Sequence, residues 1–376
     1  MQSRILIFST AYFPLVGGAE VALKEITDRL PERQFDLICA KLRPGLSRTE
    51  RIGNITIHRA GFGFSGDKYL LPLLGFWKTL WLPKPTFVWS LMASYGGFAA
   101  LLYTLFHPKA RLLLTLQEGD PLEHYEQRAG VFDVFYKKIF SRANSVQAIS
   151  RFLADWAKRM GFSGVPEIIP NGVDLERFRA LLSREERERL RQEYGYSSDD
   201  VILVTASRLS LKNGIDDLIQ SLAYLPLNDK LLILGEGEDQ EKLKRLSSQK
   251  GLDDRVRFLG KKTHEELPMF LQMGDVFVRA SLSEGLGNAF LEAMALGLPI
   301  IGTPVGGIPD FLTDQQTGLF CQPRDPESVA AAVRQLVSDP ALAERLVSNG
   351  KMLVNERYDW NKIAQEMDRL FSSLCL

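Results

Sequence analysis

The sequence predicts an α/β fold with two Rossmann-like, doubly wound parallel sheets. Short apolar runs, typical of strands buried on both faces, alternate with helical patterns along the chain. A chain of 376 residues is too long to fold around a single hydrophobic core, and its length suits two domains of ordinary size. The composition is that of a globular protein, with 45% hydrophobic and 24% charged residues. We therefore expect two α/β domains.

The first half begins with a strand, a glycine loop and a helix. The strand is the apolar run 5–8, the loop ends in Gly17 and Gly18, and the helix covers 19–30. This topology places a phosphate at the N-terminus of the helix, although helix packing alone would also explain the two glycines. Further strands are predicted at 35–40, 55–58, 86–89, 111–116, 146–149 and 167–169, and further helices at 131–141 and 151–160.

Residues 86–106 carry no charge and are long enough to span a bilayer. Ser90 and the pair Gly96 and Gly97 interrupt this segment, so we favour a strand, a glycine loop and a buried helix. Residues 61–66 match G-x-G-x-x-G, but no periodic helix opens there, and we interpret them as a loop.

Residues 69–81 are rich in Leu, Phe and Trp and lie among Lys68, Lys78 and Lys84. Such a run is more often part of a core. The alternative is an apolar lip near an acceptor.

The second half alternates strand and helix, which predicts a second doubly wound sheet. The charged run 181–194 is interpreted as a solvated helix. Strands are predicted at 201–206, 231–234, 256–259, 276–278, 299–302 and 319–321, and helices at 214–224, 240–249, 264–273, 289–296 and 308–313, with a last amphipathic helix after Trp360.

The turn after the strand 276–278 holds the most informative residues. Gly285 and Gly287 let the backbone approach a ligand closely, and the N-terminus of the next helix favours an anion. Glu284 precedes the turn, and Glu292 lies about one helical turn inside the helix. A ligand with a phosphate at the helix end and with hydroxyl groups that bind these two carboxylates is expected. A nucleotide sugar has both kinds of group. The alternative is an ordinary glycine-bearing turn between a strand and a helix.

This Glu-x7-Glu pattern around Glu-Gly-Leu-Gly resembles the donor-site motif of the retaining family-4 glycosyltransferases, which have the GT-B fold. Three further segments follow strands in the family's order, at Arg208, at Gly235 and at 304–310. Segments that end parallel strands converge on one crevice.

The resemblance implies two Rossmann-like domains that face each other across a cleft. Residues 1–170 would form the acceptor domain, joined by a tail helix within 358–376. Residues 171–357 would form the domain that binds the donor.

The resemblance also implies roles for single residues. Glu292 would bind the ribose hydroxyls, Glu284 the sugar hydroxyls, and Arg208 the diphosphate as its charge grows. Retention in this fold is thought to need no protein nucleophile, because the leaving phosphate takes the acceptor proton. The implied catalytic residues are Arg208, Lys212, Glu284 and Gln117. The implied donor-binding residues are Gly17, Gly18, Arg208, Asn213, Gly235, Leu259, Glu284, Gly285, Leu286, Gly287, Asn288 and Glu292.

The chain departs from the family pattern at three places, one of which is Asp310, where family members have a glutamate. Gln117 stands where family members usually have a histidine, and a glutamine cannot relay a proton. Asn213 stands where a lysine is usual, and Lys212 comes one residue earlier. Either Lys212 reaches the diphosphate, or it points to solvent while Asn213 caps the following helix.

The implied function is the transfer of a sugar from a nucleoside-diphosphate sugar to a glycan or lipid-linked acceptor. No metal and no cofactor besides the donor are expected, because the chain has no D-x-D triplet and no Walker A loop. The alternatives are a catalytically weakened, nucleotide-sugar-binding homologue with a regulatory role and an exported two-domain binding protein.

Charge and cysteine usage bear on partners and compartment. The 46 basic and 46 acidic residues balance, which argues against nucleic acid. The first 174 residues hold 21 Lys and Arg against 15 Asp and Glu. That mild surplus suits an acidic or anionic membrane-surface acceptor, or arises by chance. Three scattered cysteines and a start without signal-peptide features favour the cytoplasm, with the inner face of the membrane as one location.

Overall fold

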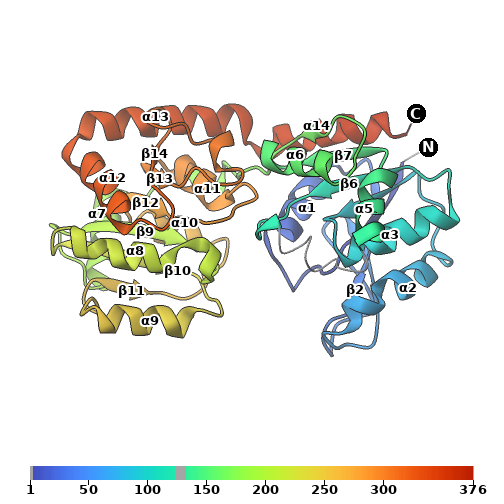
Figure 1. The fold of residues 1–376 in the computed structure, drawn as a ribbon, viewed down its shortest axis with the longest axis horizontal. Helices are drawn as coiled ribbons and strands as arrows, with labels where there is room; N and C mark the ends of the chain where they lie inside the picture. Colours follow the sequence, from blue (N-terminus) through green and yellow to red (C-terminus); the bar gives the residue numbers. More distant parts are fainter. Residues whose placement is uncertain (1–2, 123–132, 376) are drawn as a thin grey trace. The chain divides into compact units, whose positions relative to one another are not determined.

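Two separate sheets organise the chain (Figure 1). The computed structural model describes residues 3–122 and 133–375. Contacts divide the chain into unit 1, which comprises Met1–Asn171 and Trp360–Leu376, and unit 2, which comprises Gly172–Asp359. The α/β fold with two parallel sheets is thereby confirmed. Residues 131 and 132 of one predicted helix lie outside the described residues.

Unit 1 contains an eight-stranded sheet in the order β3-β4-β2-β1-β5-β6-β7-β8. All neighbouring strands run parallel except β3, which pairs antiparallel with β4. The strands are β1 Arg4–Phe8, β2 Gln34–Ala40, β3 Thr49–Ile52, β4 Ile55–Ala60, β5 Phe87–Leu91, β6 Leu112–Leu116, β7 Ser145–Ala148 and β8 Glu167–Ile168.

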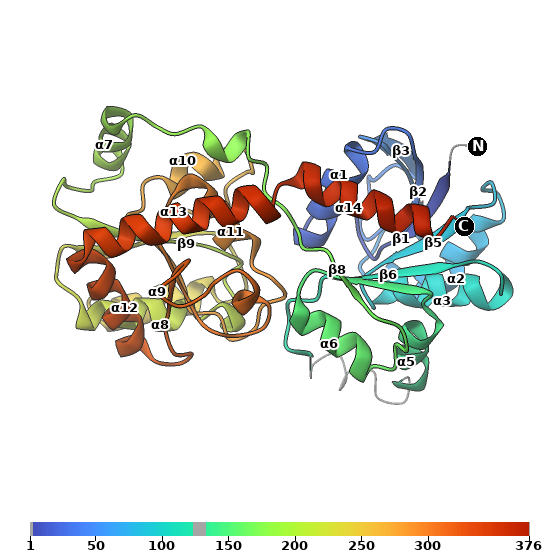
Figure 2. The same cartoon turned by 90° about the horizontal axis from the view of Figure 1, so that it is seen from above.

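Alternate residues of β1 pack on opposite faces of this sheet. Ile5 and Ile7 share a core cluster with residues of α1 and α14, and Figure 2 shows these two helices side by side. Leu6 and Phe8 share a second cluster with residues of α2 and α3. The strand therefore lies between two helical layers. The helices of unit 1 are α1 Gly18–Asp28, α2 Asp67–Thr79, α3 Tyr95–Phe106, α5 Asp133–Arg142, α6 Arg151–Arg159 and α14 Trp360–Ser373.

Unit 2 contains a six-stranded, wholly parallel sheet in the order β11-β10-β9-β12-β13-β14. Its strands are β9 Val201–Ala206, β10 Asp229–Leu234, β11 Val256–Phe258, β12 Val276–Arg279, β13 Ile300–Gly302 and β14 Leu319–Phe320. Its α-helices are α7 Arg184–Glu193, α8 Ile215–Ser221, α9 Gln240–Gln249, α10 Leu267–Leu271, α11 Asn288–Leu296, α12 Pro326–Ser338 and α13 Pro340–Arg357. Its 3-10 helices are η2 Arg177–Arg179, η3 Leu211–Asn213, η4 Leu222–Tyr224 and η5 Ile308–Asp310.

The strand order of each sheet reverses next to its first strand. In unit 1 this point lies between β1 and β5, and in unit 2 between β9 and β12. The loops at the carboxyl ends of the two strands diverge there, and ligands of open α/β sheets bind in the resulting crevice. The topology alone therefore points to the segments that follow β9 and β12.

Every predicted strand has a counterpart in the structure, but among the strands and α-helices of the described residues four are not among the predictions. The edge strand β3 has the sequence Thr-Glu-Arg-Ile, which gives no apolar run. The others are α2, α12 and α13, of which α2 contains Pro72 inside an apolar segment. The predicted helix 308–313 is shorter, because only the 3-10 turn η5 forms.

One interpretation of a glycine segment is wrong, and one is right for a reason that does not hold. Gly96 and Gly97 lie inside α3 rather than in a loop before it. Residues 61–66 form a loop as interpreted, but a helix does open after it, because α2 begins at Asp67. The buried Asp67 carboxylate accepts N–H groups from this loop, at 2.9 Å from Phe62 N and 2.7 Å from Gly63 N. A carboxylate of the chain itself thus occupies the donors that an anion would need.

Among residues 3–122 and 133–375, no helix combines the length and the apolar character that a membrane crossing requires.

Candidate functional site

The loops that follow β9, β12 and β13 meet at the strand-order reversal of unit 2. The backbone N–H of Leu282 donates to the carbonyl of Lys212 at 2.7 Å, which joins the first two loops. The N–H of Gly307 donates to the carbonyl of Glu284 at 3.0 Å, which joins the second and third. Three loops far apart in the sequence are therefore joined by backbone hydrogen bonds, and together we call them the rim.

Two glycines permit this close approach. Gly214 has a φ of +62°, and a Cβ there would lie 1.9 Å from the carbonyl oxygen of Ala280. Gly235 has a φ of +139°, and a Cβ there would lie 1.8 Å from the carbonyl oxygen of Ser207. Both positions exclude any side chain. Gly235 thus serves the packing of the Arg208 loop, and direct contact with a donor at Gly235 stays a prediction.

Helix α11 begins where the sequence predicts, directly after the glycine turn. Gly287 is its N-cap with a φ of 103°, and no side chain caps the helix. Gly285 and Leu286 precede it and are buried. Asn288 is its first residue. The positive end of a nine-residue helix therefore opens on the turn between the two predicted carboxylates.

Glu284 is held by a buried arginine that the sequence analysis did not select. The Nη2 atom of Arg279 lies 2.6 Å from the Oε2 atom of Glu284, and both side chains are nearly buried. The same Nη2 donates to Oδ1 of Asn213 at 2.7 Å. The Nδ2 atom of Asn213 in turn donates to the carbonyl of Arg208 at 2.5 Å. The loops after β9 and β12 thus share one polar cluster.

Glu292 is buried and faces a histidine. Its Oε1 atom lies 3.5 Å from Nε2 of His264, and Nη1 of Arg177 lies 3.0 Å from Nδ1 of the same ring. Arginine can only donate, so Nδ1 accepts and the neutral ring carries its proton on Nε2, towards Glu292. Burial raises the pKa of Glu292, and the positive charges of Arg177 and Arg279 oppose that rise.

The remaining predicted residues of unit 2 follow the strands β9 and β11. Arg208 is exposed and Lys212 is partly buried in the loop after β9. Leu259 follows β11, and its N–H donates to the carbonyl of Ile233 at 3.0 Å. The alternative role of Asn213 as a helix cap is wrong, because α8 has Gly214 as its N-cap and no side-chain cap.

The other three predicted residues belong to unit 1. Gly17 and Gly18 are exposed at the start of α1, where the N–H of Gly17 donates to Oε2 of Glu20 at 2.7 Å. Gln117 follows β6, and its Oε1 accepts from Nδ2 of Asn171 at 3.1 Å.

A buried carboxylate supports the Gln117 loop. Glu118 accepts the N–H of Ala93 at 2.8 Å and the N–H of Gln117 at 2.8 Å. Burial raises its pKa to about 7, although these backbone bonds oppose the rise. The carboxylate therefore joins the ends of β5 and β6.

Arg279, His264 and Arg177 are the functional candidates that sequence reasoning missed. A charged residue that ends the apolar strand β12 was the available signal for Arg279. His264 and Arg177 lie far from the Glu-x7-Glu motif in the sequence, so no local pattern indicated that they approach Glu292.

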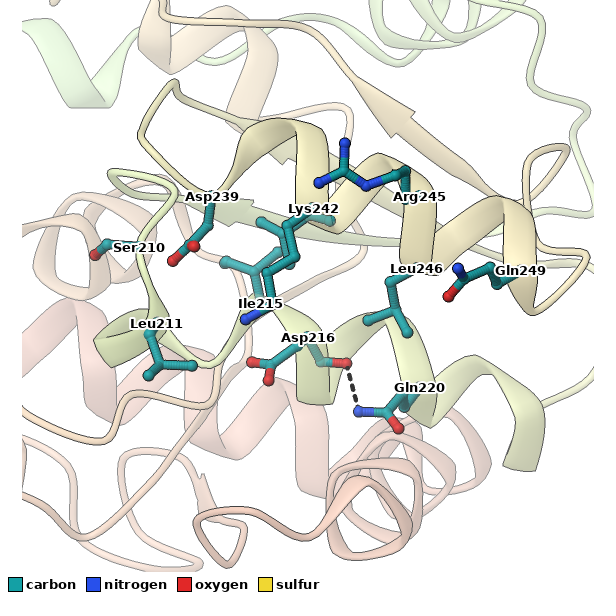
Figure 3. Close-up of a pocket in the computed structure, with 11 residues that line it drawn as sticks. Ser210, Leu211, Ile215, Asp216, Gln220, Asp239, Lys242, Arg245, Leu246 and Gln249 are labelled. Atoms are coloured by element: carbon teal, nitrogen blue, oxygen red, sulfur yellow. Dashed lines mark hydrogen bonds between the residues drawn. The ribbon is translucent and has the colours of Figure 1, made fainter.

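A pocket of about 340 Å³ lies elsewhere, between α8, α9 and the loop before α8 (Figure 3). Asp216, Asp239, Lys242 and Arg245 are among its lining residues, and Gln220 donates to the carbonyl of Asp216 at 3.2 Å. None of the residues predicted to bind the donor lines it. Within the described part of the chain, no group of three or more His, Cys, Asp or Glu residues could hold a metal ion.

Two family models match the chain. The model described as "Glycosyltransferase Family 4" matches residues 16–177, and "Glycosyl transferases group 1" matches residues 186–352. An uncharacterized glycosyltransferase of Methanocaldococcus jannaschii is 33% identical over 53% of this chain and 52% of its own length. A second one from that organism is 25% identical over 99% of this chain and 98% of its own length.

A relative with an assigned activity comes from Mycolicibacterium smegmatis. It is named GDP-mannose-dependent alpha-(1-6)-phosphatidylinositol monomannoside mannosyltransferase. The chain is 32% identical to it over 63% of this chain and 64% of the relative. The match thus spans less than two thirds of that protein.

Solved structures share the whole fold. HepE of Anabaena, in complex with UDP and glucose, has a TM-score of 0.82 at 20% identity and covers 99% of this chain and 100% of its own. Sucrose-phosphate synthase of Thermosynechococcus elongatus has a TM-score of 0.85 at 21% identity and covers 99% of each chain. With both family models and this fold, the chain belongs to the family-4 glycosyltransferases of the GT-B fold.

Proposed function

We propose that the protein transfers a sugar from a nucleoside-diphosphate sugar to an acceptor hydroxyl with retention of the anomeric configuration. This proposal rests on one observation: Glu284 and Glu292 lie at either side of the N-terminus of α11, which no side chain caps. A diphosphate needs positive charge and N–H donors, whereas a sugar and a ribose need carboxylate acceptors. The rim after β9 and β12 supplies both kinds of group.

Each group has one task in this proposal. The N-terminus of α11, with Arg208 and Lys212, stabilises the charge that grows on the leaving diphosphate. Glu292 accepts from the ribose hydroxyls, and Glu284 accepts from the sugar. The leaving phosphate takes the acceptor proton on the face from which it departs. Gln117 orients the acceptor or the sugar by hydrogen bonds, since its amide cannot relay a proton.

We also propose that the acceptor is lipid-linked and that α2 contacts an anionic membrane surface. Tyr69, Leu73 and Trp77 recur every fourth residue on α2, and all three are exposed. Trp81, which is 74% exposed, continues this stripe. Together with Phe62, Phe64 and Leu80, these seven residues form what we call the α2 patch. An apolar stripe of this kind suits the membrane interface.

Two further observations support the membrane contact. Three lysines lie close in sequence to the α2 patch: Lys68 precedes Tyr69, Lys78 follows Trp77, and Lys84 comes shortly after Trp81. Positive side chains next to an apolar patch favour binding to anionic lipids. The relative from Mycolicibacterium smegmatis is named for a phosphatidylinositol mannoside acceptor.

A panel of UDP-, GDP- and ADP-sugars tests the proposed donor. A ligand at about 100 times its dissociation constant should stabilise the protein by about 2.7 kcal/mol, which thermal unfolding detects. The stabilising donor is then incubated with the protein, and the slow release of free sugar is measured. Stabilisation without any hydrolysis would favour a regulatory homologue, and no stabilisation by any donor would contradict the proposal.

A further inference from the structure

Arg279 is an uncommon residue for its position in the sheet. It ends β12 directly after Val276, Phe277 and Val278, and it is 8% exposed. Removing a guanidinium from water costs several kcal/mol unless its partners are well placed. Such a side chain at the carboxyl end of a central strand therefore calls for a role that an apolar residue could not fill.

The protein's own partners use only part of the guanidinium. Glu284 and Asn213 both approach the Nη2 atom, at 2.6 and 2.7 Å. The Nε atom is buried and has no hydrogen-bond partner among the described residues. A guanidinium has five N–H donors, and a buried donor without an acceptor is costly. An anionic ligand would supply the missing acceptors.

The position of Arg279 fits the diphosphate of the proposed donor. Asn213, which Arg279 contacts, is bonded to the carbonyl of Arg208, the residue predicted to bind the diphosphate. Glu284, its other partner, precedes the N-terminus of α11 by a few residues. The charge of Arg279 also acts on Glu292 at the far side of the turn. The guanidinium thus lies among the groups that would surround the phosphates.

Asn213 explains why a second cation is needed here. Its side chain is 1% exposed and neutral, and it donates to Arg208 and Ser210 while it accepts from Arg279. It therefore orders the loop and supplies no charge to a ligand.

We infer that Arg279 is a second fixed cation of the donor site, which binds the diphosphate while it orients Glu284. This inference rests on the proposed function. Arg279 and the neutral residue at 213 belong together, because the guanidinium contacts Asn213 and supplies the charge that a basic side chain at 213 would otherwise supply.

Calorimetric titration of four proteins tests the inference: wild type, R279L, R279L with N213K, and R245L as a surface-arginine control from α9. UDP, GDP and ADP are titrated first, and the tightest of them is compared with its monophosphate. R279L should lower affinity for the diphosphate at least tenfold, or about 1.4 kcal/mol, and change that for the monophosphate less than about twofold. Adding N213K should restore most of the loss, because the shorter leucine leaves room for the lysine stem. R245L should match wild type.

The outcomes separate the inference from the proposed function. If R279L binds the diphosphate as wild type does, or loses both nucleotides equally, Arg279 is structural and the inference is overturned while the proposed function stands. If wild type binds none of the three diphosphates, the proposed function itself fails. Thermal unfolding is followed for every variant. If R279L does not fold, R279K decides: we expect weaker diphosphate binding by about threefold or more with the monophosphate unchanged, and equal losses overturn the inference.

Discussion

At the scale of single residues, the candidate site holds two carboxylates in unequal surroundings. Glu284 forms a short ion pair with Arg279, whereas Glu292 has a longer contact of 3.5 Å with His264 and lies deeper in the protein. Burial raises the pKa of Glu292. A carboxylate with few fixed partners is suited to accept hydroxyl groups from a ligand, which is the role we assign to it.

Glu292→Ala should lower nucleotide affinity at least tenfold and leave the fold intact. The substitution removes two charge-assisted hydrogen bonds to the ribose, each on the order of 1.5–3 kcal/mol before compensation. Calorimetry with the nucleoside diphosphate measures the loss, and circular dichroism checks the fold. Unchanged nucleotide affinity would exclude Glu292 as the ribose ligand.

Arg208→Ala and Lys212→Ala should differ if only one of these side chains reaches the diphosphate. Arg208→Ala should lower kcat/KM by a hundredfold or more, in line with about 2.7–4 kcal/mol for one preorganised donor. A similar loss in Lys212→Ala would show that the lysine also reaches the phosphates. A change below about threefold, or about 0.6 kcal/mol, would make Lys212 a residue of the loop alone.

Glu118 should make stability fall as the pH rises from about 4.5 to about 7. Its folded pKa of about 7 exceeds the ordinary value of 4.5, so in this interval the folded chain keeps a proton that the unfolded chain has lost. Urea unfolding at about pH 5 and about pH 8 measures the difference in unfolding free energy. Glu118→Gln should flatten this dependence. Parallel pH profiles of the two proteins would contradict the assignment.

At the scale of the elements, the α2 patch shows how one segment can be core and surface together. Leu71, Gly75 and Thr79 of α2 are buried, while Tyr69 and Trp77 on the other side are exposed. The core interpretation of 69–81 holds for the buried face of this helix, whereas an apolar lip near an acceptor stays a prediction for the exposed face.

The double substitution Trp77→Ser and Trp81→Ser should weaken binding to anionic vesicles. Both indole rings would lose their place at the interface, while the lysines keep their charge. Co-sedimentation with phosphatidylserine vesicles measures the loss, and binding of wild type should also weaken as salt rises. Leu227→Ser, at an exposed leucine of unit 2, serves as the control. Equal recovery with neutral and anionic vesicles would remove the electrostatic part of the proposal.

The sequence predicts elements well where their pattern is local. The runs at β1, β9 and β12 are buried on both faces, so the apolar pattern alone identifies them. By contrast, β3 is a polar edge strand, and it can be recognised as a strand only from its antiparallel pairing with β4. Elements of that kind depend on their neighbours, and their own residues carry little signal.

The same distinction holds in the candidate site. Glu284, Glu292 and the glycine turn could be predicted because strand, turn and helix are consecutive. The contacts of Arg279 with Asn213 and of His264 with Glu292 join segments 66 and 28 residues apart. Only the folded sheet brings them together, so side-chain pairs of this kind could not be predicted.

At the scale of the whole molecule, sugar transfer should need no divalent metal. The proposed cations are Arg208, Lys212, Arg279 and the N-terminus of α11, which together replace the charge that a metal would supply. Activity measured with the donor found in the panel should survive an excess of EDTA. Complete loss that manganese or magnesium restores would contradict this prediction.

The position of α14 has a consequence for how the protein is made. This helix belongs to unit 1, although unit 2 precedes it in the chain. The centroid of the Phe371 ring lies 4.9 Å from that of Trp89 and 5.6 Å from that of Phe87, in the core beside the first sheet. A ribosome must therefore translate all 188 residues of unit 2 before that core can close, roughly 10 to 40 s at ordinary elongation rates. For that time the part of the first sheet that α14 covers stays open and apolar, which is the kind of surface that chaperones bind.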